Sequence, residues 1–252
     1  MAALREALLV NGGLTTFSQM MGIPDEQLST IYWLPAYVNN STLIGQLRFG
    51  NVGVADTTVT VTIGGVVQGS YLLHPSENKK VVYNLDSGPV KVESSGSVPI
   101  VVALRDALLV NGGLSTFSQM MGIPNQQLSS TYWLPAYVNN STLNGQLRFG
   151  NVGVADTTVT VTIGGVVQGS YLLHPSENKK VVYSLDSGPV EVQSSGSVPI
   201  VAALRDALLV NGGLSTFSQL MGLPNEQLST TYWLPAYVNN PTLNGQLRFG
   251  VP

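Results

Sequence analysis

The sequence repeats itself every 100 residues, with no insertion or deletion to break the register. Residues 4–10 return as 104–110 with one change and again as 204–210. Segments 51–100 and 151–200 differ at only three positions. A tandem array presents one surface many times, whereas an enzyme needs a single site with residues in unlike environments. The period therefore predicts a structural or binding array and not an enzyme.

The period also predicts the domain organisation. A unit of 100 residues is long enough to bury its own core. We expect two whole units, residues 32–131 and 132–231. Residues 1–31 are then a partial repeat made of a last strand and a linker, and residues 232–252 are a second partial repeat made of opening strands. Because the sequence opens in mid-repeat, we expect a fragment or a mature piece of a longer array.

Composition narrows the choice of partner and compartment. Only 10% of the residues are charged and the net charge is −3, so no basic surface for nucleic acid is expected. No apolar run approaches the roughly 18 residues of a membrane span. Cysteine is absent, which excludes disulfides and thiolate metal sites. Low charge with many Gly, Thr, Ser and Asn residues favours an extracellular or cell-surface protein.

Residues 157–163 carry the clearest secondary-structure signal. Val159, Val161 and Ile163 alternate with threonines, which indicates a half-buried strand. Gly164 and Gly165 follow as a two-residue hairpin turn, because both positions favour positive φ. Seven or so short strands with frequent turns in each unit predict an all-β chain of tandem immunoglobulin-like antiparallel β-sandwich repeats.

The remaining elements of the unit are expected from the same signals. Asn144-Gly145 is predicted to be a turn, and residues 218–222 a helical turn stopped by Gly222. A second short helical turn, 224–228, begins with proline and serves as a linker. Further strands are predicted at 132–138, 147–152, 166–173, 179–183, 189–193 and 198–210.

Several segments together resemble a known group of repeats. They are residues 158–177, 186–192, 217–224, 232–235 and 247–252. The chain resembles the immunoglobulin-like β-sandwich repeats of large secreted bacterial surface proteins of the Chloroflexi type. The resemblance covers essentially the whole chain. It implies an extracellular, non-enzymatic role and provides no active-site residues.

Catalytic, metal and cofactor sites are not expected. His74 and His174 are equivalent, and each precedes a turn proline without partners at a metal-binding or catalytic spacing. No Gly-x-Ser-x-Gly motif is present. Asp56, Asp86 and their copies look like isolated turn acids, although a weak calcium site between strands stays open.

Repeated aromatic residues allow two interpretations. Tyr32, Trp33 and Tyr37 could form a face that stacks on sugars, which would make the array an adhesive or carbohydrate-binding module with a cell-surface polysaccharide as partner. The tryptophan could equally be a packing residue of the core or of the contact between units. The copies in the next unit are Tyr132, Trp133 and Tyr137.

The first and last strands suggest self-association. Both partial repeats contain apolar strands, and such strands need a sheet edge. We expect another copy of the chain to supply it, so that the chain assembles head to tail by strand addition into a filament or surface layer. The alternative is a monomer in which both ends are satisfied internally. The residues expected at the assembly contact are Leu4, Leu8, Val10, Tyr232, Trp233, Leu247 and Phe249.

Overall fold

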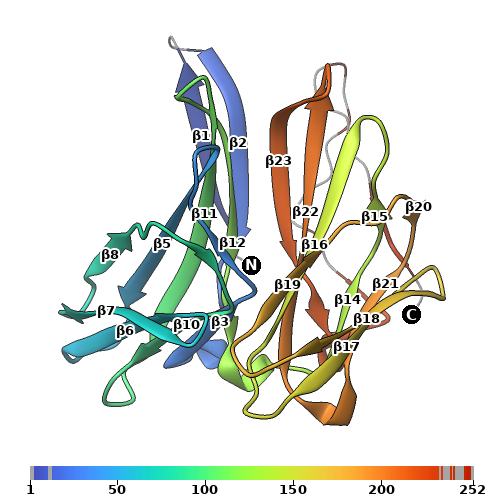
Figure 1. Cartoon of the computed structure of the whole chain (residues 1–252). Helices are drawn as coiled ribbons and strands as arrows, with labels where there is room; N and C mark the ends of the chain where they lie inside the picture. The colour runs from blue at the N-terminus through green and yellow to red at the C-terminus, as the bar shows by residue number, and fades with distance from the viewer. Residues whose placement is uncertain are drawn as a thin grey trace.

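The structure is a computed structural model that describes residues 3–10, 13–232, 234, 239, 241 and 247–250. Every strand pairing in it is antiparallel, and helical structure within these residues is limited to short 3-10 turns. The expectation of an all-β chain is confirmed. Figure 1 shows two similar groups of sheets side by side, with long hairpins where they meet. No helix in the described part of the chain is long and apolar enough to span a membrane.

Residues 31–124 form one set of strands. A five-stranded sheet has the order β13-β3-β10-β6-β7, a four-stranded sheet has the order β12-β11-β5-β8, and β4 pairs with β9. The bounds are β3 Ile31–Leu34, β4 Tyr37–Val38, β5 Leu43–Asn51, β6 Thr57–Ile63, β7 Val66–Leu73, β8 Asn78–Val81, β9 Asp86–Ser87, β10 Val90–Ser94, β11 Ile100–Val110, β12 Gly113–Met121 and β13 Ile123–Pro124.

Residues 131–224 repeat this arrangement, with sheets β18-β17-β21-β14-β24 and β19-β16-β22-β23 and the pair β15–β20. A further hairpin, β1 Ala3–Val10 with β2 Gly13–Met21, precedes both sets. The bounds are β14 Thr131–Leu134, β15 Tyr137–Val138, β16 Leu143–Asn151, β17 Thr157–Ile163, β18 Val166–Leu173, β19 Asn178–Val181, β20 Asp186–Ser187, β21 Val190–Ser194, β22 Ile200–Val210, β23 Gly213–Met221 and β24 Leu223–Pro224.

Each set encloses a core shared by its two larger sheets. In the first set, Val59 and Val61 of β6 pack in one cluster with Leu47 and Phe49 of β5. Period-two alternation explains this, because β6 buries every second residue. The four larger sheets together take a propeller-like arrangement and are not clearly immunoglobulin-like sandwiches. The unit boundaries expected from the sequence stay a prediction.

The strongest strand and turn predictions are confirmed. Residues 157–163 form β17, and Gly164 and Gly165 have φ values of 58° and 77° in the turn to β18. Short 3-10 helices follow a proline at Asp25–Gln27, Asn125–Gln127 and Asn225–Gln227, as the linker prediction required.

Two local predictions are wrong. Residues 218–222 are not a helical turn, because β23 continues through Met221 in register with β22. Asn144-Gly145 is not a turn, because both residues lie inside β16. The turn before β16 is made by Asn140, whose side-chain oxygen accepts the amides of Thr142 and Leu143 at 2.9 Å each.

Candidate functional site

Three equivalent hairpins meet at the junctions between repeats. They are β1–β2, β11–β12 and β22–β23, and they share one register and one bulge, which follows Leu8, Leu108 and Leu208. β12 contacts β2 and also contacts β23, so the three hairpins pack in series (Figure 1). The described part of the chain therefore contains two junctions, which are built from equivalent residues of successive repeats.

Hydrogen bonds between equivalent residues join the hairpins. The Thr116 hydroxyl lies 3.1 Å from the hydroxyl of Thr16 and 3.1 Å from that of Thr216. The amide of Gln119 donates to the Ser18 hydroxyl oxygen at 3.0 Å, and the amide of Gln219 donates to the Ser118 hydroxyl oxygen at 3.0 Å. β12 and β23 are edge strands of their sheets, so these bonds satisfy outward amides that a sheet edge leaves unpaired.

A glutamine ladder runs beside the hairpins. The side-chain amide of Gln127 donates to the side-chain oxygen of Gln27 at 3.1 Å, and Gln227 donates to Gln127 at 2.9 Å. An open cavity of about 470 Å³ lies here and is lined by the same seven positions from three successive copies, 19–24 with 27 and their equivalents. Its lining is rich in methionine, which adapts readily to its neighbours.

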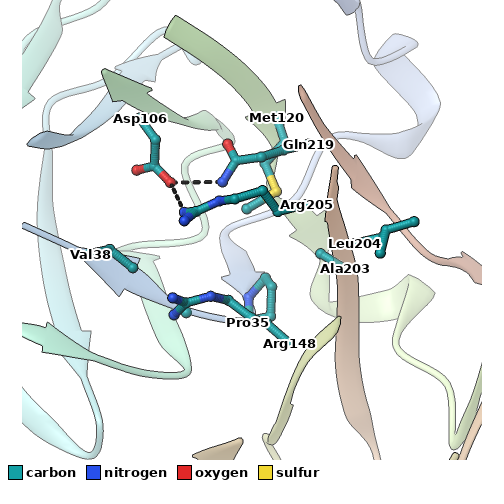
Figure 2. Close-up of a pocket in the computed structure, with 10 residues that line it drawn as sticks. Pro35, Val38, Asp106, Met120, Arg148, Ala203, Leu204, Arg205 and Gln219 are labelled. Atoms are coloured by element: carbon teal, nitrogen blue, oxygen red, sulfur yellow. Dashed lines mark hydrogen bonds and ion pairs between the residues drawn. The ribbon is translucent and has the colours of Figure 1, made fainter. Parts of the chain in front are cut away.

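A buried ion pair lies at the centre of the second junction (Figure 2). The Asp106 carboxylate is 1% exposed, and one of its oxygens accepts hydrogen bonds from Arg205 at 3.1 Å and from the Gln219 side chain at 2.7 Å. Burial raises the pKa of Asp106, while Arg205, Gln219 and Arg148 oppose that rise. A buried carboxylate requires such partners, so the acid of one repeat holds the arginine of the next. We call this arrangement the Asp106 lock.

The Asp106 lock has no room for a substrate. The cavity beside it measures about 10 Å³, which is the space of a single water. Pro35, Val38, Met120 and Arg148 are among the residues that line it (Figure 2). The geometry is that of a structural contact between repeats.

The same arrangement recurs, less buried, at the first junction. Glu6 lies 3.5 Å from Arg105 and 3.9 Å from Arg48, which are the equivalents of Arg205 and Arg148. The third equivalent acid is Asp206. Burial raises its pKa and the charge of Arg248 opposes that rise. One buried oxygen of Asp206 has no hydrogen-bond partner among the described residues.

Two of the residues expected at the assembly contact, Leu4 and Leu247, are exposed, unlike their copies. Leu47 lies opposite Leu104 in the pairing of β5 with β11, and Leu147 lies opposite Leu204 in the pairing of β16 with β22. All four of these leucines are buried. The remaining copies of the pair are Leu4, 51% exposed, and Leu247, 57% exposed.

Phe249 and Tyr232 follow the same trend, and Leu8 does not. Phe249 is 90% exposed, whereas its copies Phe49 and Phe149 are buried. Tyr232 is also exposed, and Leu8 is half-buried. Trp233 and the side chain of Val10 lie outside the described residues.

The alternative of a sugar-stacking face is contradicted for its four tyrosines. Tyr32, Tyr37, Tyr132 and Tyr137 have no exposed surface, so a ligand has no access to their rings. Their hydroxyls bond to backbone atoms inside each unit.

The two described tryptophans are half-buried and hold a neighbouring turn. The indole N–H of Trp33 donates to the side-chain oxygen of Asn125 at 2.9 Å, and Trp133 donates to Asn225 at 3.0 Å. Each tryptophan thus joins an early strand of its repeat to the linker that follows that repeat.

The aspartates that were interpreted as isolated acids include three that are paired. Asp56 lies 3.0 Å from Nδ1 of His74, and Asp156 lies 3.0 Å from Nδ1 of His174. Asp86 lies 3.7 Å from Arg148. The two histidine pairs are exposed. Within the described part of the chain, no group of three or more His, Cys, Asp or Glu side chains gathers at a possible metal site.

Sequence reasoning missed the Asp106 lock entirely. Its residues are distant in sequence, and each one looks ordinary. A usable signal was present, because an Arg-acid pair recurs at 5–6, 105–106 and 205–206 in strands that are otherwise apolar. Charges placed in an apolar strand need partners, and an array provides them at the equivalent positions of the next copy.

Comparison with known proteins gives no close relative. No protein-family profile and no curated protein matches the sequence. Among solved structures, the chain is similar to the M60 catalytic domain with the CBM51-1 and CBM51-2 domains of ZmpB from Clostridium perfringens, at 7% identity and a TM-score of 0.21 over 77% of this chain and 33% of that one. It therefore spans about a third of that structure.

Two further structures are similarly distant. An anti-sigma factor domain-containing protein has 8% identity and a TM-score of 0.22 over 79% of this chain and 82% of its own. A GH2 beta-galacturonidase from Eisenbergiella tayi has 14% identity and a TM-score of 0.19 over 86% of this chain and 41% of its own. Likeness at this level assigns no activity to the chain.

Proposed function

We propose that the chain is a structural repeat module of an extracellular filament or surface layer, and that it associates head to tail by β-strand addition. One observation carries the proposal. The leucine pair that is buried at Leu47–Leu104 and at Leu147–Leu204 has two further copies, Leu4 and Leu247, and both are exposed.

The internal pairings provide the template for the contact. Residues 43–51 pair with β11, and residues 143–151 pair with β22 at the same relative register. The third copy of the first strand includes residues 247–250, and the copy of its partner is β1, which pairs only with β2 in the described structure. In a second molecule, β1 provides the sequence with which both internal copies of residues 247–250 already pair.

Burial of apolar surface drives the association. Leu4, Leu247 and Phe249 together present large side chains to water, and a fully buried residue of this kind contributes about 1.5–3 kcal/mol. Addition of the strand also satisfies the backbone groups at the exposed edge of β1. Both contributions favour a second copy over an unrelated partner, because only a copy reproduces the internal pattern.

The finer description of the module is part of the same proposal. Two sheets that share one core favour an immunoglobulin-like module, and low charge favours a place outside the cell. A non-enzymatic role agrees with the small cavity beside the Asp106 lock, which measures about 10 Å³. Within the two described sets of strands, a polysaccharide-binding role of the expected aromatic face would rest on Trp33 and Trp133, because its four tyrosines are buried.

Light scattering coupled to size-exclusion chromatography tests the proposal. The wild-type chain is expected to show a mass that grows with concentration. Leu4→Lys blocks one end, Leu247→Lys blocks the other, and each variant alone is expected to remain monomeric. Val54→Lys is the matched control, because Val54 is 97% exposed outside the sheets.

A mixing experiment makes the test specific for head-to-tail contact. The Leu4→Lys chain keeps an intact end at Leu247, and the Leu247→Lys chain keeps an intact β1. An equimolar mixture is therefore expected to form dimers and nothing larger. Wild-type chain that stays monomeric at every concentration, or a mixture that stays monomeric while wild type assembles, overturns the proposal.

A further inference from the structure

We propose that Asp206 is the binding site for Arg5 of the next copy, and that this ion pair sets the register of strand addition. The inference rests on the proposed function and adds to it the residue pair that selects one register. It follows from the three equivalent acids Glu6, Asp106 and Asp206. The first two form ion pairs with arginines of the same chain.

The first two members define the rule. Asp106 of one repeat pairs with Arg205 of the next at 3.1 Å, with Arg148 beside it in the same cavity lining. Glu6 pairs with the equivalent residues Arg105 and Arg48. In both junctions the acid therefore meets one arginine from the hairpin of the next repeat and one from the strand paired with that hairpin.

Asp206 is the third member and has half of this environment. It lies close enough to Arg248, the copy of Arg148, for that charge to lower its pKa against the effect of burial. The copy of Arg205 that would complete the site is an arginine 100 residues further along the repeat, and in a second molecule this is Arg5. Asp206 has a buried carboxylate oxygen without a hydrogen-bond partner in the described structure, and so do Glu6 and Asp106, which already have their arginines. The pairing with Arg5 is therefore inferred from the equivalent positions of the three acids and from the strand register.

The strand register brings the two arginines together. In the pairing of β16 with β22, Arg205 lies opposite Gln146 and Arg148 lies opposite Ala203, so the two guanidinium groups start two residues apart along the ladder. The equivalent register in an assembled pair places Leu247 opposite Leu4 and Arg248 opposite Ala3. In the assembled pair, Arg5 therefore lies beside Arg248 in the same way that Arg205 lies beside Arg148 within one chain.

Hydrophobic pattern alone does not fix this register. A slip of one residue exposes the apolar face, but a slip of two residues restores the alternation. Such a slip moves an arginine by about 6.6 Å along the strand. After that displacement, the arginine can no longer form a contact with Asp206 as short as the contact between Arg205 and Asp106. The acid therefore discriminates between registers that apolar burial leaves nearly equal.

Cysteine cross-linking tests the register, since the chain contains no cysteine of its own. A chain carrying Leu4→Cys is mixed with a chain carrying Leu247→Cys, or with one carrying Phe249→Cys as the probe of a two-residue slip. With Asp206 intact, oxidation is expected to join positions 4 and 247 and not positions 4 and 249. With Asp206→Ala, both products are expected.

A charge exchange provides the second test. Asp206→Arg alone and Arg5→Asp alone are each expected to assemble poorly, because each places like charges at the junction. Their equimolar mixture restores one opposite pair at every junction and is expected to assemble as wild type does. Asp156→Ala is the matched control, since the structure pairs this exposed acid with His174 on the surface. Circular dichroism of each variant verifies the fold.

The outcomes separate the two proposals. If wild type assembles and Asp206→Ala keeps the single cross-link between positions 4 and 247, the register inference is wrong and the strand-addition proposal stands. If the charge-exchange mixture fails while wild type assembles, the pairing of Asp206 with Arg5 is wrong. If wild type does not assemble at all, both proposals fall together.

Discussion

The hydroxyl of Tyr37 donates a hydrogen bond to the backbone carbonyl of Gly45, with 2.6 Å between the two oxygens. The same hydroxyl oxygen accepts the amide of Tyr83 at 2.8 Å. One buried tyrosine thus joins β4 to β5 and to the segment before β9. The second set of strands repeats the contact, with Tyr137 donating to Gly145 at 2.7 Å and accepting Tyr183 at 2.7 Å.

Removal of this hydroxyl should destabilise the first unit. Tyr37→Phe leaves the amide of Tyr83 without its partner inside the protein, and an unsatisfied buried donor costs about 1–3 kcal/mol. Urea unfolding followed by fluorescence measures the loss. Thr58→Ala is the control, because the exposed Thr58 side chain lies outside this network. A midpoint for Tyr37→Phe equal to that of the control would show that the hydroxyl is dispensable.

The glycine under this ring should tolerate no side chain. A Cβ at Gly45 would lie 2.6 Å from the carbonyl oxygen of Val38 and 3.0 Å from the Tyr37 ring. Because one of these atoms belongs to the backbone, relief needs a shift of the strand, and overpacking of this kind costs about 1–3 kcal/mol. Gly45→Ala should therefore lower the unfolding midpoint.

A matched glycine separates crowding from the general effect of adding a methyl group. Gly113, also in a strand, would place its Cβ no closer than 3.6 Å to any atom outside its chain neighbours. Gly113→Ala should leave the midpoint nearly unchanged. Equal losses for the two substitutions would count against the packing argument.

The local sequence pattern predicted the strands well where interactions between neighbouring residues determine the conformation. Alternation at Val159, Val161 and Ile163 and the glycine pair at 164–165 act within a few residues, and both features were predicted correctly. Asn144-Gly145 was misread because the glycine there serves a distant contact. It makes space for the Tyr137 ring and does not provide a turn.

Contacts between repeats could not be predicted from local sequence patterns. Residues 218–222 end in a glycine and look like a helical turn, yet the register with β22 and the hydrogen bond from the Gln219 amide to the Ser118 hydroxyl oxygen hold them as a strand. The Asp106 lock joins residues about 100 positions apart, and only the order in which hairpins pack brings them together. The period predicted that copies would meet but not which faces would touch.

The Asp106 lock should contribute more to stability than its copy at the first junction. Asp106→Ala leaves Arg205 buried without its carboxylate, and breaking a buried pair from one side costs about 3–5 kcal/mol. Glu6→Ala removes a more exposed acid with contacts of 3.5 and 3.9 Å, for which about 0–1 kcal/mol is expected. Parallel urea titrations compare the two, and similar losses would contradict the difference in burial.

The two histidines should titrate above their ordinary value. A hydrogen bond from His74 to Asp56, with 3.0 Å between the atoms, raises the pKa of His74 above the roughly 6.5 of an unfolded chain. Since the folded value is the higher one, the resulting stabilisation is fully present below the unfolded pKa. It is lost as pH rises through the folded pKa.

Proton NMR measures this pKa directly. Asp56→Asn should return the pKa of His74 toward its ordinary value. His174 keeps Asp156 and serves as an internal control in the same spectrum. A pKa of His74 that does not change in the variant would show that the contact is absent in solution.

The three equivalent leucines should respond differently to the same substitution. Leu104 and Leu204 are buried, and Leu104 packs in the first core, so Leu104→Ala should cost about 2–5 kcal/mol. Leu4 is half exposed in the single chain, and Leu4→Ala should cost less than about 1 kcal/mol when the protein is dilute. At concentrations where wild type assembles, the cost of Leu4→Ala should grow, because strand addition buries the same side chain that the internal copies already bury. Unfolding measured at a low and a high concentration separates these contributions, and a cost for Leu4→Ala that is independent of concentration would show that Leu4 is not buried by association.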